Sequence, residues 1–440
     1  MYPHTTPDWE LYEAHLDEAE FLEIQWERAL SAPDRRWPDV ASREARFLAH
    51  VDALALGGRA VAQRLLRPAL ESEEASRVTS AALALLVDGG EAARDAVLSA
   101  FLEGSPEPRP ALRRALELCE RDDLLPRLMV PLHSTGAEPD VLAAVLEVLA
   151  ARGQGPGVPL EGFLSHPEPR VVAAACRVLP HPAGVPPTQP VLQRLMAALD
   201  SPVPAVRDAA LVAGMIQGLR AAWLRCRQVV GSRDTPDRLP LMLLAMGGDE
   251  RELELLFKRL EEPRLRTDVA WALGHSGRVA AIERCLELLD DADAGVVRLA
   301  TESLATMTGF PLEGGHVEQE ETSHEEAETP DATVEQEVEK TLPRATPAAA
   351  RTWWTKERER FVSGTRYLGG VPFSIKALVR AFGTMPARRW SALTLELAIR
   401  SRGRGIVTPR ALSAQRQQQL TRLTGFAPRG EQTFSAFLDL

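Results

Sequence analysis

The sequence predicts an all-α protein: an α-solenoid of about eight to nine helix–turn–helix repeats, with an N-terminal helical cap and an acidic disordered insertion. Three observations predict this class. Similar segments recur roughly every 30 residues, apolar helical segments end at turns that contain Pro or Gly, and aromatic residues make up only 5% of the 440 residues. A protein built this way consists of thin helical layers, and each unit touches only its neighbours.

The clearest copies of the repeat are residues 199–210 and 289–300. In each, an apolar helix ends at an acidic turn, and a second helix opens with Val-Arg followed by a small residue, Ala209 or Ala300. Weaker copies lie at 104–112, 165–175 and 261–273. The first helices of eight units are expected near Gly58, Gly90, Asp122, Pro156, Thr188, Gln217, Gly248 and Arg278. Proline between the helices stops the first one, because it lacks an N–H and restricts the residue before it.

These residues resemble the HEAT repeat, in which an Asp in the inner turn and a Val-Arg pair recur. The resemblance covers residues 58–310 and implies an α-solenoid whose second helices line the concave side. Three arginines at the Val-Arg position, Arg170, Arg207 and Arg298, are expected to form a structural ladder against acids of neighbouring turns, such as Asp200 and Asp290. The alternative is that they bind a ligand.

The first 57 residues lack the repeat pattern and are predicted to be the N-terminal helical cap. Residues 8–30 carry apolar side chains at helical spacing, and residues 40–56 form a second helix that ends at Gly57-Gly58. A cap shields the open apolar end of a solenoid. The alternative is that this helix pair is a docking surface for a helix of a partner.

Charge is distributed in three blocks. Residues 1–312 carry a net charge of −13, residues 313–340 carry −10, and residues 341–440 carry +12. Residues 311–350 hold few large apolar side chains, so we expect an acidic disordered linker there. His316 and His324 within it lack the rigid spacing of a metal site. We expect the acidic linker to pair electrostatically with the basic block or to compete with a charged partner.

Residues 351–440 are predicted to fold again into a further HEAT-like repeat and cap. A helix opens at Thr352, a turn spans 364–372, and two helices over 374–382 and 388–397 follow the repeat plan. Together with residues 15–22, 28–30, 49–52 and 366–370, this arrangement resembles a proteobacterial HEAT-type family without established biochemical activity, whose members are associated with type VI secretion loci. The resemblance implies an accessory or adaptor role.

The function that we expect from this pattern is a non-enzymatic scaffold that binds protein partners in its concave groove. Contacts are expected at groove-facing positions of second helices and at ten aromatic and basic residues: Trp353, Trp354, Arg358, Arg366, Tyr367, Arg388, Arg389, Trp390, Trp223 and Arg227. Arginines interleaved with aromatics also suit nucleic acid, so a nucleic-acid-binding module in residues 344–440 is the alternative. The purely structural interpretation is that these aromatic side chains form the hydrophobic core of the terminal unit.

Catalytic and cofactor motifs are missing from the sequence. We find no phosphate-binding loop, no dinucleotide turn and no His-Glu-x-x-His helix, and the only His-Glu pair, His324-Glu325, lies in the acidic stretch. We expect no cofactor and no metal; a HEAT-type lyase or hydrolase is a weak third alternative. Cys119, Cys176, Cys226 and Cys285 lie too far apart for a metal cage or a disulfide framework. Neither an export signal nor an apolar run long enough for membrane insertion is evident, so we expect a cytoplasmic protein.

Overall fold

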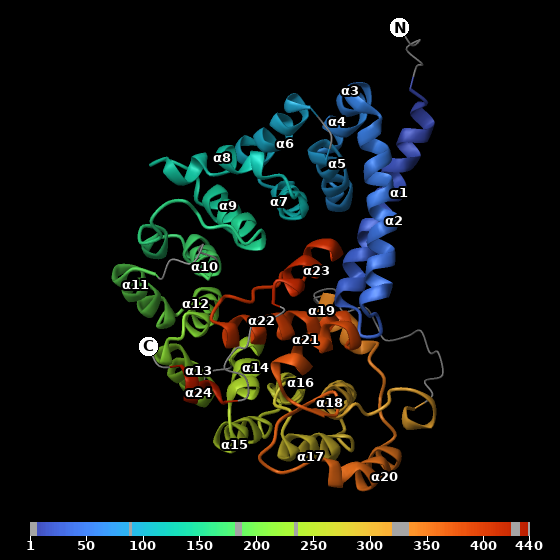
Figure 1. Cartoon of the computed structure of the whole chain (residues 1–440), viewed down its shortest axis with the longest axis vertical. Coiled ribbons are helices and arrows are strands. Elements are labelled where there is room, and N and C mark those ends of the chain that lie inside the picture. The colour runs from blue at the N-terminus through green and yellow to red at the C-terminus, as the bar shows by residue number, and fades with distance from the viewer. Residues whose placement is uncertain are drawn as a thin grey trace. The chain divides into compact units, whose positions relative to one another are not determined.

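The computed structural model describes residues 7–87, 90–180, 187–232, 236–318, 334–423 and 432–438. The regular secondary structure of these residues is almost entirely helical, which confirms the predicted all-α class (Figure 1). The chain divides into two compact units. The N-terminal unit comprises residues 1–30, 37–213 and 406–423, and the C-terminal unit comprises residues 31–36, 214–405 and 424–440.

The helices of the N-terminal unit are α1 (Trp9–Ser31), α2 (Trp37–Leu56), α3 (Gly58–Val61), α4 (Arg67–Ala69), α5 (Ala75–Val87), α6 (Glu91–Glu103), α7 (Arg109–Leu118), α8 (Leu125–Leu128), α9 (Pro139–Ala151), α10 (Pro169–Val178), α11 (Gln189–Leu199), α12 (Pro204–Ile216) and α23 (Ser413–Thr421). Those of the C-terminal unit are α13 (Arg220–Gly231), α14 (Arg238–Gly247), α15 (Glu250–Arg259), α16 (Arg266–Leu273), α17 (Val279–Leu288), α18 (Ala294–Thr308), α19 (Val334–Lys340), α20 (Pro347–Glu357), α21 (Ile375–Thr384), α22 (Trp390–Ser401) and α24 (Phe434–Phe437).

The second helices of the repeats begin where the sequence signals predict. Pro139, Pro169 and Pro204 each occupy the first position of their helix, where the missing N–H costs nothing. Asp293 accepts hydrogen bonds from the N–H groups of Gly295 and Val296 and so caps α18. The local chemistry of each turn therefore places the helix boundaries.

Within each unit, second helices of successive repeats pack against one another. In the N-terminal unit, α5 packs on α7 and α7 on α9; in the C-terminal unit, α14 packs on α16 and α16 on α18 (Figure 1). The contact faces are rich in fully buried Ala and Leu, for example Ala81, Leu112 and Leu146. Small side chains allow helix axes to approach closely. These are the layers that the repeat pattern predicts.

Two repeats depart from the predicted pair of helices. The first helix expected near Asp122 is divided into two 3-10 turns and the short α8, because Pro126 and Pro131 interrupt it. The one expected near Pro156 is reduced to a 3-10 turn at Phe163–Ser165, within a segment rich in Gly and Pro. The second helix of each of these repeats, α9 and α10, forms as predicted.

The C-terminal unit contains the structure's one described strand pair, β1 (Tyr367–Leu368) and β2 (Val371–Pro372), which are antiparallel. Gly369 and Gly370 form the turn with φ of 58° and 79°, as a tight hairpin of this kind requires. The hairpin covers the ends of two second helices: Tyr367 N–H donates to the Gly277 carbonyl at 2.7 Å, and Gly369 N–H donates to the Thr306 carbonyl at 2.8 Å. It thus ends the helical stack.

Both ends of the predicted disordered linker, 311–350, contain regular secondary structure. Val317 and Ala345 form an antiparallel bridge, α19 spans Val334–Lys340, and α20 begins at Pro347. The sequence looks unfoldable because few apolar residues are present, but Leu342 and Ala345 are fully buried and Glu339 is ion-paired with Arg238 and Arg388. The remainder of the expected linker, 319–333, lies outside the described residues.

The arginines of the Val-Arg positions contact acids or carbonyl groups within their own unit. Arg170 pairs with Asp140 at 3.0 Å and Arg207 with Asp208 at 3.0 Å, whereas Arg298 donates to the Leu342 carbonyl. Asp290 pairs with Arg351. Arg170 thus bridges two successive repeats.

No helix in the described part of the chain joins sufficient length with the apolar character that crossing a bilayer demands.

Candidate functional site

The aromatic residues predicted to contact a partner lie mainly in the core of the C-terminal unit. Trp223, Trp354, Tyr367 and Trp390 are all at least nine-tenths buried. Trp353 is half-buried, with its ring edge-on to Phe310 at 5.4 Å between centroids. Their burial agrees with the alternative interpretation, that the aromatics form the core of the terminal unit, since neighbouring helices already cover these rings.

Most of the predicted arginines are also engaged inside this unit. Arg388 pairs with Glu302 at 2.9 Å and with Glu339 at 3.1 Å, and Arg389 pairs with Glu302 at 3.0 Å. Arg366 forms a two-pronged pair with Glu396. Their carboxylate partners come from distant parts of the sequence, so no local pattern could reveal that these arginines are buried.

Two predicted arginines are more exposed. Arg358 donates to the Phe361 carbonyl at 2.6 Å and pairs with Glu283 at 3.2 Å. Arg227 pairs with Glu252 at 2.9 Å and keeps 44% of its side-chain surface exposed. These two ion pairs lie on different helices, so they do not form a shared cationic surface with the buried arginines.

An open groove lies instead on the N-terminal unit, across the second helices α7, α9 and α10. Its volume is about 410 Å³. The lining side chains recur at helical spacing on each helix, which places them on one face; they are Pro106, Arg109, Pro110, Arg113, Asp140, Ala143, Ala144, Glu147, Arg170, Ala173, Arg177 and Ala205. We call this the second-helix groove. The sequence predicted groove-facing positions of second helices, and of these residues it singled out Arg170 as a member of a structural ladder.

The chemistry of the groove combines a small apolar floor with charged walls. Ala143, Ala144 and Ala173 form the floor and leave the helix backbones accessible to a bound chain. Arginines outnumber carboxylates in the walls by four to two. The groove is therefore suited to an extended segment that carries carboxylates.

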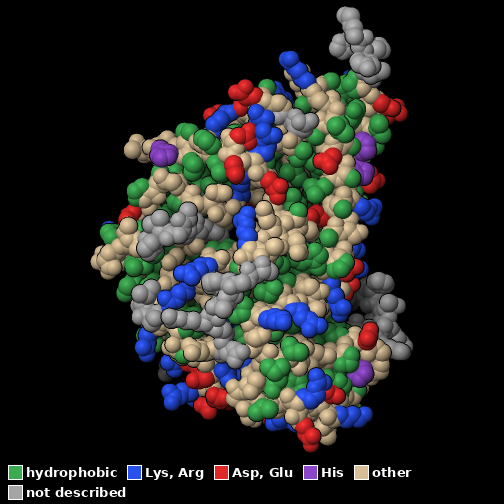
Figure 2. Space-filling view, in the orientation of Figure 1, with side chains coloured by type: hydrophobic (Ala, Val, Ile, Leu, Met, Phe, Trp, Pro, Cys, Tyr) green, Lys and Arg blue, Asp and Glu red, His purple; other side chains and the backbone are tan. Residues whose placement is uncertain are grey.

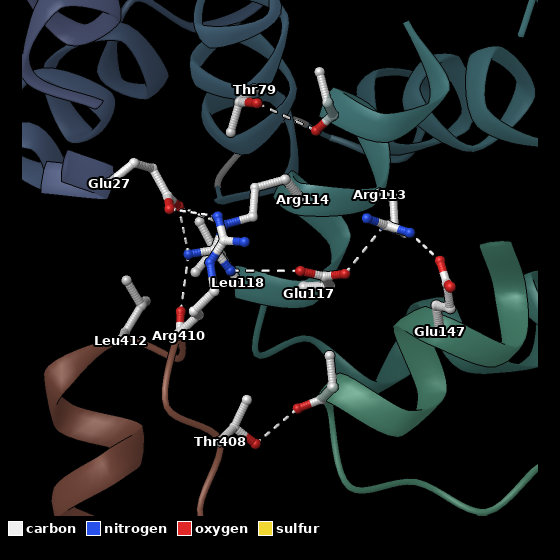
Figure 3. Close-up of polar contacts among 12 residues, drawn as sticks. Glu27, Thr79, Arg113, Arg114, Glu117, Leu118, Glu147, Thr408, Arg410 and Leu412 are labelled. Atoms are coloured by element: carbon white, nitrogen blue, oxygen red, sulfur yellow. Dashed lines mark hydrogen bonds and ion pairs between the residues drawn. The ribbon is translucent and has the colours of Figure 1, made fainter. Parts of the chain in front are cut away.

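Alternating charges connect the groove to the interior of the same unit. Arg177 pairs with Glu147 at 3.0 Å, Glu147 with Arg113, and Arg113 with Glu117 at 3.2 Å. Arg114 then pairs with Glu117 at 3.4 Å and with Glu27 of α1 at 2.6 Å (Figure 3). We call this series, from Arg177 to Glu27, the charge ladder. It fixes the side chains of three successive repeats relative to one another.

A distant segment of the chain, residues 406–423, ends the ladder. Arg410 pairs with Glu27, and the Arg410 carbonyl accepts a hydrogen bond from Arg114 at 2.8 Å (Figure 3). The Thr408 hydroxyl donates to the Ala151 carbonyl at the end of α9 at 3.1 Å. Nothing in the local sequence predicts this contact, because more than 250 residues separate Thr408 from Ala151.

Burial shifts the titration of the carboxyl groups around the ladder. Burial raises the pKa of Glu117, although Arg114 and Arg113 lower it. Burial likewise raises the pKa of Glu23 and of Glu44, with Glu27 adding to the effect at Glu23. This surface therefore concentrates carboxylates that are costly to keep charged unless a cation lies on them.

Metal ligands and thiols give no further site within the described residues. No group of three or more His, Cys, Asp or Glu side chains could hold a metal ion there. All four cysteines are buried, and burial raises the pKa of Cys176 and Cys285 to about 12. Buried thiols of this kind are unreactive.

On the face shown in Figure 2, basic and acidic side chains lie interspersed over the part that contains α6 and α7.

No protein-family model and no curated protein matches this chain. Among solved structures, a crystal structure of an engineered protein is 16% identical, with a TM-score of 0.29 over 68% of this chain and 96% of that chain. A structure of human deoxyhypusine hydroxylase in complex with glycerol is 22% identical, with a TM-score of 0.23 over 58% of this chain and 95% of that chain. TM-scores this low carry no argument about function.

Proposed function

We propose that this chain is a non-enzymatic protein-binding scaffold that holds a peptide segment of a partner in the second-helix groove. The observation that carries the proposal is the groove itself: an alanine floor across three helices, bordered by charged side chains at helical spacing. Ion pairs hold Arg113, Glu147 and Arg177 in place, so little side-chain freedom is lost on binding.

The charge of the walls indicates the chemistry of the partner segment. Arg170 keeps 73% and Arg177 keeps 47% of its side-chain surface exposed, so both can form a further ion pair. An extended segment with Asp or Glu at alternate positions would place carboxylates against both arginines while its backbone lies on the alanines.

The resemblance to a HEAT-type family associated with type VI secretion loci supports a narrower version of the proposal. In that version the chain is a cytoplasmic adaptor, and the partner is a component of the secretion machinery. The version rests on the end motifs of the sequence alone, and the identity of the bound partner decides it.

Affinity purification from the native cell, followed by mass spectrometry, gives the partner whose dissociation constant is then measured with pure proteins. We expect Arg170→Glu with Arg177→Glu to weaken binding at least about tenfold, because two attractive contacts become repulsive. Arg194→Glu is the matched control: Arg194 is an exposed arginine on the first helix α11, outside the groove lining. An unchanged dissociation constant in the double variant would refute binding in this groove.

A further inference from the structure

Residues 406–423 belong to the N-terminal unit, although the residues before and after them, 214–405 and 424–440, belong to the C-terminal unit. Gly403 and Gly405 precede the point of entry, and Gly403 has a φ of 76°, which a residue with a side chain would adopt only at a cost. We call residues 406–423 the inserted segment.

Polar contacts hold the inserted segment to the N-terminal unit. Ser413 donates its N–H and its hydroxyl to the two oxygens of Glu44 in α2, at 2.7 and 2.9 Å. Arg416, only 1% exposed, lies over the ring of Trp37 at 4.9 Å and within 3.7 Å of Glu44. Arg410 pairs with Glu27 on the ladder. Arg410, Ser413 and Arg416 of the segment therefore contact two carboxylates, Glu27 and Glu44.

Few apolar side chains of the inserted segment are fully buried. Within the inserted segment, all of which is described, only two apolar side chains, Val407 and Ala411, are buried. A segment held mainly by ion pairs and hydrogen bonds differs from a core helix, because a competitor with the same charged groups can replace those contacts one by one.

The surface beneath the segment has the properties of a binding site in its own right. Glu23, Glu27, Glu44 and Glu117 gather on α1, α2 and α7, and burial raises the pKa of three of them. Keeping several partly buried carboxylates together is unfavourable unless a cation compensates them. Arg114 of α7 pairs with Glu27 and Glu117, and the inserted segment supplies two further cations, Arg410 on Glu27 and Arg416 near Glu44.

We infer that this acidic surface is a binding site for an arginine-containing peptide of a protein partner, and that the inserted segment is an internal copy that occupies it. The peptide it fits carries Arg, a hydroxyl residue three positions later, and a second Arg three positions after that, as Arg410, Ser413 and Arg416 do. The serine supplies the two hydrogen bonds to Glu44, and the second arginine lies over the ring of Trp37.

This site shares no residue with the lining of the second-helix groove, although the charge ladder connects the two, and it takes a partner of the opposite charge. The groove walls are mainly arginine, whereas the surface beneath the inserted segment is mainly carboxylate. The inference therefore stands without the proposed function, and variants in the groove should leave it unchanged.

The first test uses the full wild-type chain and a synthetic peptide of residues 406–423. Hydrogen exchange followed by mass spectrometry distinguishes the amides of the chain from those of the peptide. We expect excess peptide to lower the protection of residues 406–423 of the chain at millimolar concentrations, because a tethered segment competes at an effective concentration of about that size. Unchanged protection at saturating peptide would show a permanent strap and would overturn the inference.

The second test removes the internal competitor. In the Arg410→Glu, Arg416→Glu chain, the inserted segment is repelled, and we expect the fluorescently labelled wild-type peptide to bind at least about tenfold more tightly than to the wild-type chain. Adding Glu27→Gln and Glu44→Gln should abolish this gain, whereas Arg170→Glu with Arg177→Glu should not. A chain in which residues 408–416 are replaced by Gly-Ser repeats serves as a second competitor-free form. If neither form binds the peptide, or if binding ignores Glu27 and Glu44, the inference is wrong.

Discussion

Two ion-pair networks, one in each unit of this protein, differ in how much water their charges meet. In the C-terminal unit, Glu396 is 4% exposed and pairs with Arg366 and Arg400, which are 10% and 1% exposed. In the N-terminal unit, Glu147 is 24% exposed and pairs with Arg113 and Arg177, which are 35% and 47% exposed. The first arrangement replaces water around charges inside a core, and the second leaves charges in contact with water.

This difference separates charges that specify the fold from charges that can bind. A buried ion pair must keep every partner, because removal of one leaves an uncompensated charge in a medium that solvates it poorly. A partly exposed pair contributes little to stability, since water compensates either charge, and it can exchange its partner at low cost. The four predictions below test this contrast, from the largest expected effect to the smallest.

The largest effect is expected from breaking the buried network of the C-terminal unit. Glu396→Ala leaves Arg366 and Arg400 without their shared carboxylate and should lower the free energy of unfolding by about 3–5 kcal/mol. Denaturant unfolding of the purified chain measures this. Thr394→Ala, a nearby buried polar position on the same helix, should cost much less, since its hydroxyl bonds only the Ser391 carbonyl. Equal losses in both variants would contradict a special role of the network.

A smaller effect is expected where the inserted segment meets α2. Glu44→Ala removes the acceptor of the Ser413 N–H and hydroxyl and should lower the protection of the Ser413 amide by about 1–3 kcal/mol. Hydrogen exchange at single-residue resolution measures this. Glu10→Ala, an exposed carboxylate in the first turn of α1, is the control. If the Ser413 amide keeps its protection, contacts other than Glu44 hold the segment.

The third prediction concerns pH and the buried His275. Burial, with Arg389, Arg366 and Arg388 around the ring, holds the pKa of His275 well below its usual value of 6.5. The unfolded chain therefore binds a proton below about pH 6.5 that the folded chain refuses, so the free energy of unfolding should fall with decreasing pH by up to about 1.4 kcal/mol per pH unit. Above about pH 6.5, the contribution of His275 to the free energy of unfolding should stay constant. His275→Gln should remove this part of the slope, whereas His133→Gln, at an exposed position, should leave it. Identical slopes in all three proteins would refute the assignment.

The smallest change in stability is expected on the charge ladder. Arg177→Ala breaks a partly exposed pair with Glu147 and should change the free energy of unfolding by less than about 1 kcal/mol. The same variant should weaken binding of the partner in the second-helix groove. Comparing both measurements with those for Glu396→Ala tests the contrast directly. A loss of several kcal/mol would place the ladder in the same class as the buried network.

The sequence predicts the repeat units well because their signals are local. Pro139, Pro169 and Pro204 mark the starts of second helices, and short-range sterics and capping are sufficient to place such boundaries. The prediction of intact first helices near Asp122 and Pro156 is wrong for the same local reason, since prolines within those segments interrupt them. Of the candidate site, the sequence predicted the kind of surface, namely groove-facing second helices, and it singled out Arg170, as a member of a structural ladder, among the lining residues.

What the sequence determined by itself is the all-α class, the turns and the block pattern of charge, because each depends on residues close together along the chain. Tertiary structure decided which charges are buried. Arg389 meets Glu302, and Arg388 meets Glu339, only after helices far apart in the sequence have packed. It also decided that residues 406–423 join the N-terminal unit, since the match of Arg410 to Glu27 depends on distance in space and leaves no periodic trace in the sequence.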